Sequence, residues 1–314
     1  MEMTSATPIS TRSRNEQETA SRSGTKAKKK TKAKAAQIPP RRLDFDFSPA
    51  TAKRYFYDDD PFLSAFWLTM STLFPAGEDF FIASVRHYRD QIDDPELRAQ
   101  IAGFIGQEAM HKKEHVAWNA MASELGYPTR ALEEVLGGVL GGLQRFTPKI
   151  FQLATTVCLE HYTAITAEQL LRDPAQQASV DPEALKIWLW HALEENEHKS
   201  VAFDVFQQVS GNHLLRAGAM IPTTLIYFMV ITGFQIRLLA ADGQLFNIPG
   251  HVRGLKYLFG SNGLFTRLKK PYLDFYRRDF HPTQHDTVAL LDEWRDKLFG
   301  KSGLLLKHYR AASV

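Results

Sequence analysis

The motif Glu-x-x-His occurs twice in long stretches with helical patterning, once from Glu108 to His111 and once from Glu195 to His198. Residues three apart lie on the same side of a helix, so each copy can present a carboxylate and an imidazole to the same metal ion. Oxygen and imidazole ligands together suit iron, zinc and manganese. The doubled motif therefore predicts a metal site that two helices share.

Each copy follows a glutamate that stands among apolar residues. Glu160 is the only carboxylate between Pro148 and Thr166, and Glu78 lies within FPAGEDFFIASV. A buried carboxylate is strongly unfavourable unless it is neutralised, paired or bound to metal. The order Glu, Glu-x-x-His, Glu, Glu-x-x-His is also the ligand set of two-metal carboxylate sites in four-helix bundles. Buried ion pairs with arginine or lysine are the alternative. The six candidate ligands are Glu78, Glu108, His111, Glu160, Glu195 and His198.

Further titratable residues lie close to these ligands in the sequence. His115 follows His111 by four residues and His191 precedes Glu195 by four, so both should face the site. Such groups can orient a ligand through a hydrogen bond, serve as ligands themselves, or sit in the core as satisfied side chains. The residues in this group are His87, His115, His161, His191 and Glu194, with Glu114 as a further reserve.

Helical patterning begins at Pro61 and continues without any β-alternating run, which predicts an all-α protein. Short loops join the first helix to the second and the third to the fourth, and a longer glycine-containing stretch at 126–148 joins the two pairs. This layout predicts a ferritin-like four-helix bundle with one longer crossover and additional C-terminal helices. The four long helices are expected at 61–91, with a kink or break near Pro75, 95–125, 148–172 and 182–211.

Composition divides the chain of 314 residues into three expected parts. Residues 1–41 are basic, lack apolar periodicity and are expected to be disordered. Residues 42–211 should form the bundle with its di-metal site, and residues 212–314 a helical extension packed on it. The basic tail is interpreted as solubilising, with electrostatic contact to nucleic acid or anionic lipid as the alternative.

The segment 217–236 contains no charged residue and is long enough to span a bilayer. We expect a core helix or an interface helix of a homodimer. The alternatives are a helix lying on a membrane surface and a true span. The next segment, HVRGLKYLFGSNGLFTRLKKPYLDFYRRDF, mixes aromatic and basic residues, which would suit either peripheral membrane contact or a surface helix packed through its aromatic face.

The expected location is the cytoplasm, with contact at the inner face of the membrane as a further option. Cys158 is the single cysteine, which excludes an internal disulfide, and no apolar signal region follows the N-terminus. The sequence shows no nucleotide-binding loop, cysteine nucleophile or serine triad, so metal is the only cofactor expected.

Several long stretches of the sequence resemble one bacterial family, the predicted metal-dependent hydrolases. The resemblance covers roughly residues 42–297 and rests on GEDFFIASVRHYRDQI, GFIGQEAMHKKEH, LEHYTAITAEQLL, WLWHALEENEHKSVAFDV and KPYLDFYRRDFHPTQHD. It implies a metal site at the same six residues. The family's description is itself a prediction about chemistry.

Three functions agree with such a site. A pair of iron ions can activate dioxygen for oxidation of a hydrophobic small molecule, with electrons from a separate donor protein. Zinc, manganese or iron can instead activate water to hydrolyse an ester or a phosphate. A non-catalytic protein that binds metal or a membrane is the third. Four carboxylates with two histidines in a helical bundle favour the oxidoreductase, by analogy of fold.

Overall fold

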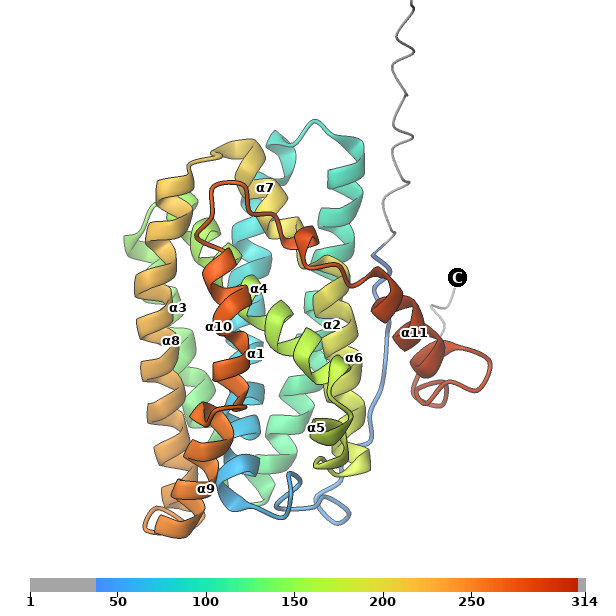
Figure 1. Cartoon of the computed structure of the whole chain (residues 1–314), viewed down its shortest axis with the longest axis vertical. Helices are drawn as coiled ribbons and strands as arrows, with labels where there is room; N and C mark the ends of the chain where they lie inside the picture. Colours follow the sequence, from blue (N-terminus) through green and yellow to red (C-terminus); the bar gives the residue numbers. More distant parts are fainter. Residues whose placement is uncertain (1–37, 310–314) are drawn as a thin grey trace, which may run out of the picture. The chain divides into compact units, whose positions relative to one another are not determined.

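The computed structural model describes residues 38–309, and these form an all-α fold (Figure 1). Within that range the only β-type pairings are two isolated bridges, Leu43 with Tyr309 and Tyr57 with Val180. The predicted fold class is therefore confirmed. The predicted disorder of residues 1–37 concerns residues outside the described range.

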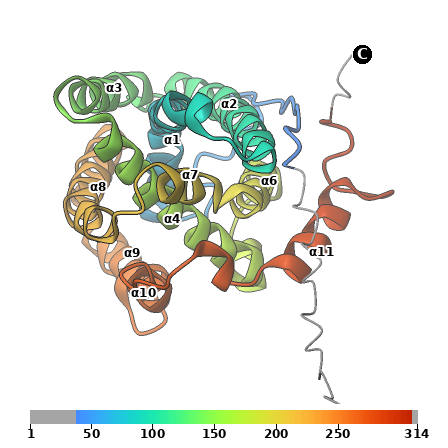
Figure 2. The ribbon, with the colours of Figure 1, turned by 90° about the horizontal axis from the view of Figure 1, so that it is seen from above.

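The four helices that carry the candidate ligands pack around one another. They are α1 (Pro61–Tyr88), α2 (Pro95–Glu124), α4 (Lys149–Arg172) and α6 (Pro182–His198). α1 packs on α2 and α4, and α6 packs on the same two helices, as the view from above shows (Figure 2). Four helices in mutual contact can direct side chains from every element into one interior space.

Local sequence fixes where three of these helices begin. Asp60, Asp94 and Asp181 each precede a proline, and each aspartate side chain accepts hydrogen bonds from backbone N–H groups of the first turn. The aspartate satisfies donors that would otherwise lack partners, and the proline needs no donor at that position. The register of the ligand-bearing positions is therefore set from the N-terminal end of each helix.

Two predicted helices differ from the observed ones. α1 is one continuous helix that includes Pro75, so of the two alternatives expected there, a kink or a break, the break does not occur. The predicted helix 182–211 is two helices, because a turn at Lys199 and Ser200 separates α6 from α7 (Val201–Val209). The Lys199 ammonium is held at this turn by His285 O at 2.6 Å and Thr287 Oγ1 at 2.9 Å.

The connections have unequal lengths, as expected. The short 3-10 turn η1 (Arg89–Gln91) lies between α1 and α2, and α5 (Pro174–Ala178) lies between α4 and α6. The passage from α2 to α4 contains α3 (Thr129–Phe146), which packs on α1 and α2. The ferritin-like topology itself stays a prediction.

The C-terminal part begins with α8 (His213–Ala241), which packs on α1 and α4. α8 is the one helix among residues 38–309 that is long and apolar enough to cross a membrane by length and composition. One side of it is buried in the protein, where the Gln235 amide donates to Phe62 O at 2.9 Å. The remaining elements are α9 (Ile248–Phe259), α10 (Leu264–Asp274), η2 (Pro282–Gln284) and α11 (Val288–Phe299).

Residues 38–41 are part of the folded protein, so the prediction of a disordered tail that reaches residue 41 is wrong at its C-terminal end. Ile38 and Arg41 are buried. Ile38 and Pro40 lie so close to α2 that a methyl group on Gly103 or Gly106 would collide with them. Two glycines on one side of α2 therefore make room for this segment beside the ligand-bearing helices.

Candidate metal centre

All six predicted ligands come together in the interior of the four helices. Their oxygen and nitrogen atoms form overlapping groups in which every atom lies within 4.8 Å of the others. One group, which we call the cavity side, contains Glu78, His111 and His191. A second group, the anchored side, contains Glu108, Glu160 and His198. A third group links the two sides and contains Glu108, His111 and Glu195.

The atoms that face one another in this cluster make few hydrogen bonds. Both carboxylate oxygens of Glu78, Glu108 and Glu160 are buried without a hydrogen-bond partner. His198 Nε2 lies 3.0 Å from Glu108 Oε1 and 3.6 Å from Glu160 Oε2, so one imidazole nitrogen stands among carboxylate oxygens of two helices. Buried polar groups are almost always paired, so this convergence of lone pairs fits the donor set of a metal site.

The pKa shifts of the cluster show one ion pair beside three carboxylates that are hard to ionise: against the effect of burial, His198 lowers the pKa of Glu195 and Glu195 raises that of His198, each well beyond its usual range. Burial and neighbouring carboxylates raise the pKa of Glu78 and of Glu160 well above the usual range. Burial also raises the pKa of Glu108, against the effect of His198. Carboxylates that resist ionisation become ionised when a cation lies between them. The residues present therefore fit metal ions, and the buried ion pairs with arginine or lysine that were the alternative do not form at these three glutamates.

His111 is oriented by a buried ion pair. Its Nε2–H donates to Glu194 Oε2 at 3.0 Å, and the Arg41 guanidinium donates to Glu194 Oε1 at 2.8 Å. This leaves Nδ1 as the free lone pair of the imidazole, 3.6 Å from Glu195 Oε1. Burial raises the pKa of Glu194 to about 8, although Arg41 opposes the shift. Glu194 thus lies beside a candidate ligand and positions it.

His198 is oriented in the same manner, by Gln107 of α2. Its Nδ1–H donates to Gln107 Oε1 at 2.9 Å, which leaves Nε2 directed at the carboxylates. The Gln107 amide donates in turn to Glu197 Oε2 at 2.9 Å. Arg41 holds both oxygens of Glu197, at 2.7 and 2.8 Å. One arginine therefore supports the residues behind both motif histidines.

A chain of hydrogen bonds gives His191 the position of a ligand. Ser71 Oγ donates to Asn119 Oδ1 at 2.7 Å, so it accepts from His115 Nδ1–H at 2.8 Å. Burial lowers the pKa of His115 well below its usual range, so the ring is neutral and its Nε2 accepts from His191 Nδ1–H at 2.7 Å. The lone pair of His191 Nε2 then points at Glu195 Oε1, 2.9 Å away. Two acceptors that face each other can share a cation.

Two predicted neighbours of the site, His87 and His161, lie elsewhere. His87 is exposed and its ring contacts Tyr88, because nine residues after Glu78 the helix has turned to its opposite side. His161 points away from the cluster, as the residue next to Glu160 must, and its Nε2 bonds to Pro271 O at 3.0 Å. The reserve residue Glu114 also lies outside the cluster, where it accepts from Phe45 N and Lys113 Nζ.

Sequence reasoning missed three residues that support the site, Arg41, Gln107 and Glu197. Gln107 and Glu197 stand directly beside a motif residue, at Glu108 and His198, and this adjacency was the only signal available. Arg41 gave no signal, because it lies 153 residues from its partner Glu194 in the sequence and follows a run of other basic residues.

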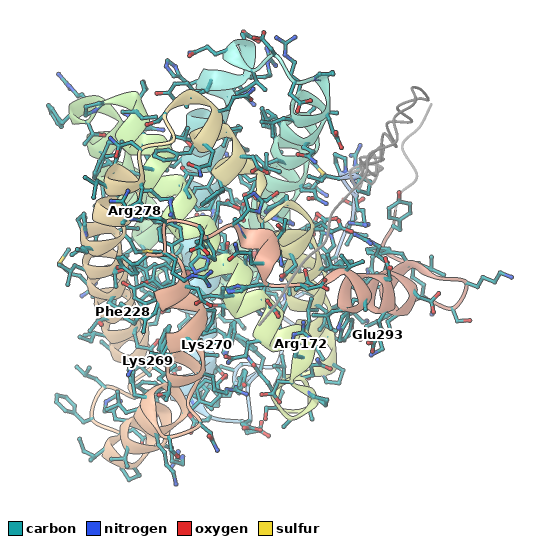
Figure 3. All side chains as sticks on the ribbon, turned by 45° about the horizontal axis from the view of Figure 1, so that its top comes forward. Arg172, Phe228, Lys269, Lys270, Arg278 and Glu293 are labelled. Carbon is teal, nitrogen blue, oxygen red and sulfur yellow. The ribbon has the colours of Figure 1, made fainter. Side chains whose placement is uncertain are left out.

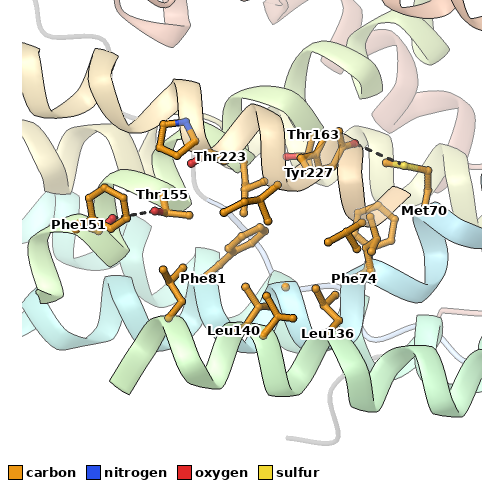
Figure 4. A pocket seen from close by; sticks show the side chains of 18 residues that line it. Met70, Phe74, Phe81, Leu136, Leu140, Phe151, Thr155, Thr163, Thr223 and Tyr227 are labelled. Carbon is orange, nitrogen blue, oxygen red and sulfur yellow. Dashed lines mark hydrogen bonds between the residues drawn. The ribbon is translucent and has the colours of Figure 1, made fainter. Parts of the chain in front are cut away.

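An apolar cavity of about 230 Å³ lies next to the cavity side, between α1, α3, α4 and α8 (Figure 4). No charged residue lines it. A smaller cavity of about 40 Å³ reaches His191 and Glu195 and shares four lining residues with the larger one: Met70, Phe74, Thr163 and Tyr227. The Phe74 ring packs on His191, with ring centroids 4.3 Å apart, so this side chain separates the large cavity from the cluster.

The comparison with known families agrees with this centre. A family model described as predicted metal-dependent hydrolase matches residues 39–286, so the chain belongs to that family. No curated protein and no solved structure matches the chain. The resemblance noted in the sequence is thereby confirmed. All residues of the cluster fall within the matched range.

Proposed function

We propose that the protein is a di-metal carboxylate oxidoreductase that uses dioxygen to oxidise a hydrophobic small molecule. The cavity side and the anchored side would each hold one ion, with Glu108 and Glu195 between them. A pair of iron ions, when bound, would supply the electrons that reduce dioxygen. Zinc and manganese suit the same ligands.

The single observation that carries the proposal is the position of the apolar cavity. Its lining residues, among them Phe81, Leu140 and Val230, can hold an aliphatic or aromatic group, and Phe74, which also lines it, packs on His191. Concave, mostly apolar pockets with a few polar groups at one end are the usual form of small-molecule sites.

The lining also argues against a polar substrate. A phosphate or a charged ester would need a cationic side chain or free donors, and none of the lining residues is charged. The hydroxyl of Thr155 donates to Phe151 O, and that of Thr163 donates to Glu160 O. These two hydroxyls are therefore occupied within their own helix, and an apolar substrate is favoured over a polar one.

The protein's own side chains would have two tasks in this reaction. The cavity residues bind the substrate and exclude water, while Glu194, Gln107 and His115 hold the ligand imidazoles in fixed orientations. No nucleotide-binding loop occurs in the sequence, so we propose that a separate protein supplies further electrons.

Hydrolysis by metal-activated water is the second candidate, because the family is described by that activity. A direct test is to load the full-length protein anaerobically with ferrous iron and to measure dioxygen uptake together with near-ultraviolet absorbance. The proposal predicts uptake and a new absorbance band that reductant removes. Glu114→Gln, a buried glutamate of α2 outside the cluster, serves as the control and should behave as the unmodified protein.

A different set of results would contradict the oxidoreductase proposal and support hydrolysis. Protein that holds zinc in stoichiometric amount, takes up no dioxygen after iron loading, and cleaves p-nitrophenyl hexanoate would be a hydrolase. Loss of that cleavage in Glu160→Gln would assign it to the same metal centre.

A further inference from the structure

The outward surface of α8 carries a long uncharged stripe. Its large side chains are exposed and recur at helical spacing: Leu214, Ile221, Leu225, Met229 and Ile236. α9 carries a second exposed stripe, which consists of Ile248, Val252, Leu255 and Phe259. We call these two stripes the apolar face. Extended apolar surface of this kind marks contact with another molecule or with a membrane.

The two stripes are joined by aromatic contacts through α10. The Phe265 ring lies 5.0 Å from that of Phe228 on α8 and 5.3 Å from that of Phe259 on α9. Phe246, in the loop that connects α8 to α9, has 86% of its surface exposed. The apolar face therefore continues from one helix to the next.

The segment that carries the apolar face, residues 213–273, is rich in basic side chains and poor in acidic ones. Between residues 213 and 273 the only acidic residue is Asp242, and Arg54 pairs with it. Arg253 and Arg267 are exposed and pair with Asp60 and Asp173, and the other exposed bases of the segment include Arg237, Lys256, Lys269 and Lys270. Figure 3 shows Lys269 and Lys270 near Phe228, on the side of the protein opposite Glu293. The face is thus apolar in its centre and positive at its border.

This combination selects one partner. Amphipathic helices with apolar residues on one face and bases beside them lie in the interface of membranes that contain anionic lipid. A second copy of the chain would bring equally basic borders together, whereas an anionic lipid surface complements them. We propose that the apolar face docks on the surface of a membrane containing anionic lipid, with α8 and α9 lying in the interface.

Docking on this face would bring the apolar cavity to the bilayer. Val139 of α3 and Ile226 of α8 line the cavity and are each partly exposed, so the cavity opens between these two helices. Ile226 is the neighbour of Leu225, at the centre of the α8 stripe. A substrate dissolved in lipid could enter the cavity from the membrane. This consequence rests on the proposed function, but the docking itself does not.

The test is sedimentation of the full-length, metal-loaded protein with lipid vesicles. We expect binding to vesicles of phosphatidylcholine and phosphatidylglycerol in roughly equal parts, and weaker binding to phosphatidylcholine alone. The double variant Leu225→Asp, Met229→Asp should bind more than about tenfold more weakly, because two charges would have to enter the interface. Leu225 and Met229 are 68% and 67% exposed and do not line the cavity, so dioxygen uptake in vesicle-free buffer should be unchanged.

Val288→Asp is the matched control, since Val288 is 66% exposed on α11, far from α8 (Figure 2). It should bind vesicles as the unmodified protein does.

Equal binding by the double variant would overturn the proposal and assign vesicle binding to other residues, such as the basic N-terminal ones. A dimer that the double variant converts to monomer, without any change in vesicle binding, would make the face a contact between two copies. Failure of dioxygen uptake in every variant would contradict the proposed function and leave the docking result intact.

Discussion

The two sides of the buried cluster have different surroundings. The cavity side lies against Phe74, beyond which the apolar cavity opens. The anchored side lies against Phe104, whose ring centroid is 5.0 Å from that of His198, and is held by the hydrogen bond of His198 to Gln107. The difference suggests a division of tasks, in which the substrate approaches one ion and the other ion stays fixed.

The largest effect is expected from Glu108→Ala, because Glu108 belongs to the anchored side and to the linking group. Metal content should fall from about two ions per chain to near zero. Elemental analysis of purified protein measures this, with Glu114→Gln as the control on the same helix. A full complement of metal in Glu108→Ala would exclude the linking role.

His191 and His115 should differ in how strongly their loss affects metal. His191→Ala removes a candidate ligand of the cavity side, so about one ion per chain should remain. His115→Ala removes only the group that orients His191 and should weaken affinity by about 10- to 100-fold at full stoichiometry. Titration with ferrous iron distinguishes the two outcomes. Identical curves for both variants would mean that His191 is not a ligand.

Arg41→Ala should destabilise the folded protein by about 3–5 kcal/mol, because it leaves the fully buried Glu194 without its cationic partner. Arg295→Ala is the control, since this partly exposed arginine pairs with Glu197 at the rim of the same network and should cost about 1 kcal/mol or less. Urea denaturation of both variants measures the difference. Equal losses of stability in the two variants would show that the pairing of Arg41 with Glu194 stabilises the protein no more than the pairing of Arg295 with Glu197.

Leu140→Trp should fill the cavity and lower turnover of a hydrophobic substrate by roughly tenfold or more, with metal content unchanged. Val135→Trp, on the exposed side of α3, should leave turnover unaffected. Steady-state rates and metal analysis of both variants give the test. Unchanged turnover in Leu140→Trp would separate the cavity from the reaction.

The most gradual effect concerns the pH dependence of metal-free protein. The pKa values of Glu78 and Glu160 are raised well above the usual range, and that of Glu194 to about 8. Groups with a raised folded pKa stabilise the protein at low pH and lose this contribution as pH rises through that value. The free energy of unfolding should therefore fall as the pH rises from the ordinary carboxyl pKa of about 4.3 towards about 8, by up to about 1.4 kcal/mol per pH unit for each proton that only the folded protein retains. In metal-loaded protein Glu78 and Glu160 are already ionised, so the decline should be smaller.

Much of the helical layout could be predicted from the sequence because its signals are local. The Asp-Pro pairs at Asp94 and Asp181 mark helix starts, and the helix predicted at 148–172 is observed as Lys149–Arg172. The turn at Lys199 was missed because its ammonium is held by His285 and Thr287, which are distant in the sequence.

The ligand set was accessible for a similar reason, since Glu78 and Glu160 stand out against apolar neighbours. The sequence leaves the role of His191 open because that role depends on a hydrogen-bond chain through His115 and Ser71, on two other helices. The partnership of Arg41 with Glu194 likewise appears only after folding. Spacing within a helix predicts which side a residue faces, whereas its partner on another element requires the three-dimensional structure.

The central claim is that the cavity side and the anchored side each hold an iron ion. Anomalous X-ray diffraction from crystals of protein purified without added metal, measured on either side of the iron absorption edge, tests it most directly. We predict two iron peaks, one among Glu78, His111 and His191 and the other among Glu108, Glu160 and His198. The account would be contradicted if only one iron peak appeared, if the peaks came from zinc instead of iron, or if the metal were bound elsewhere in the chain.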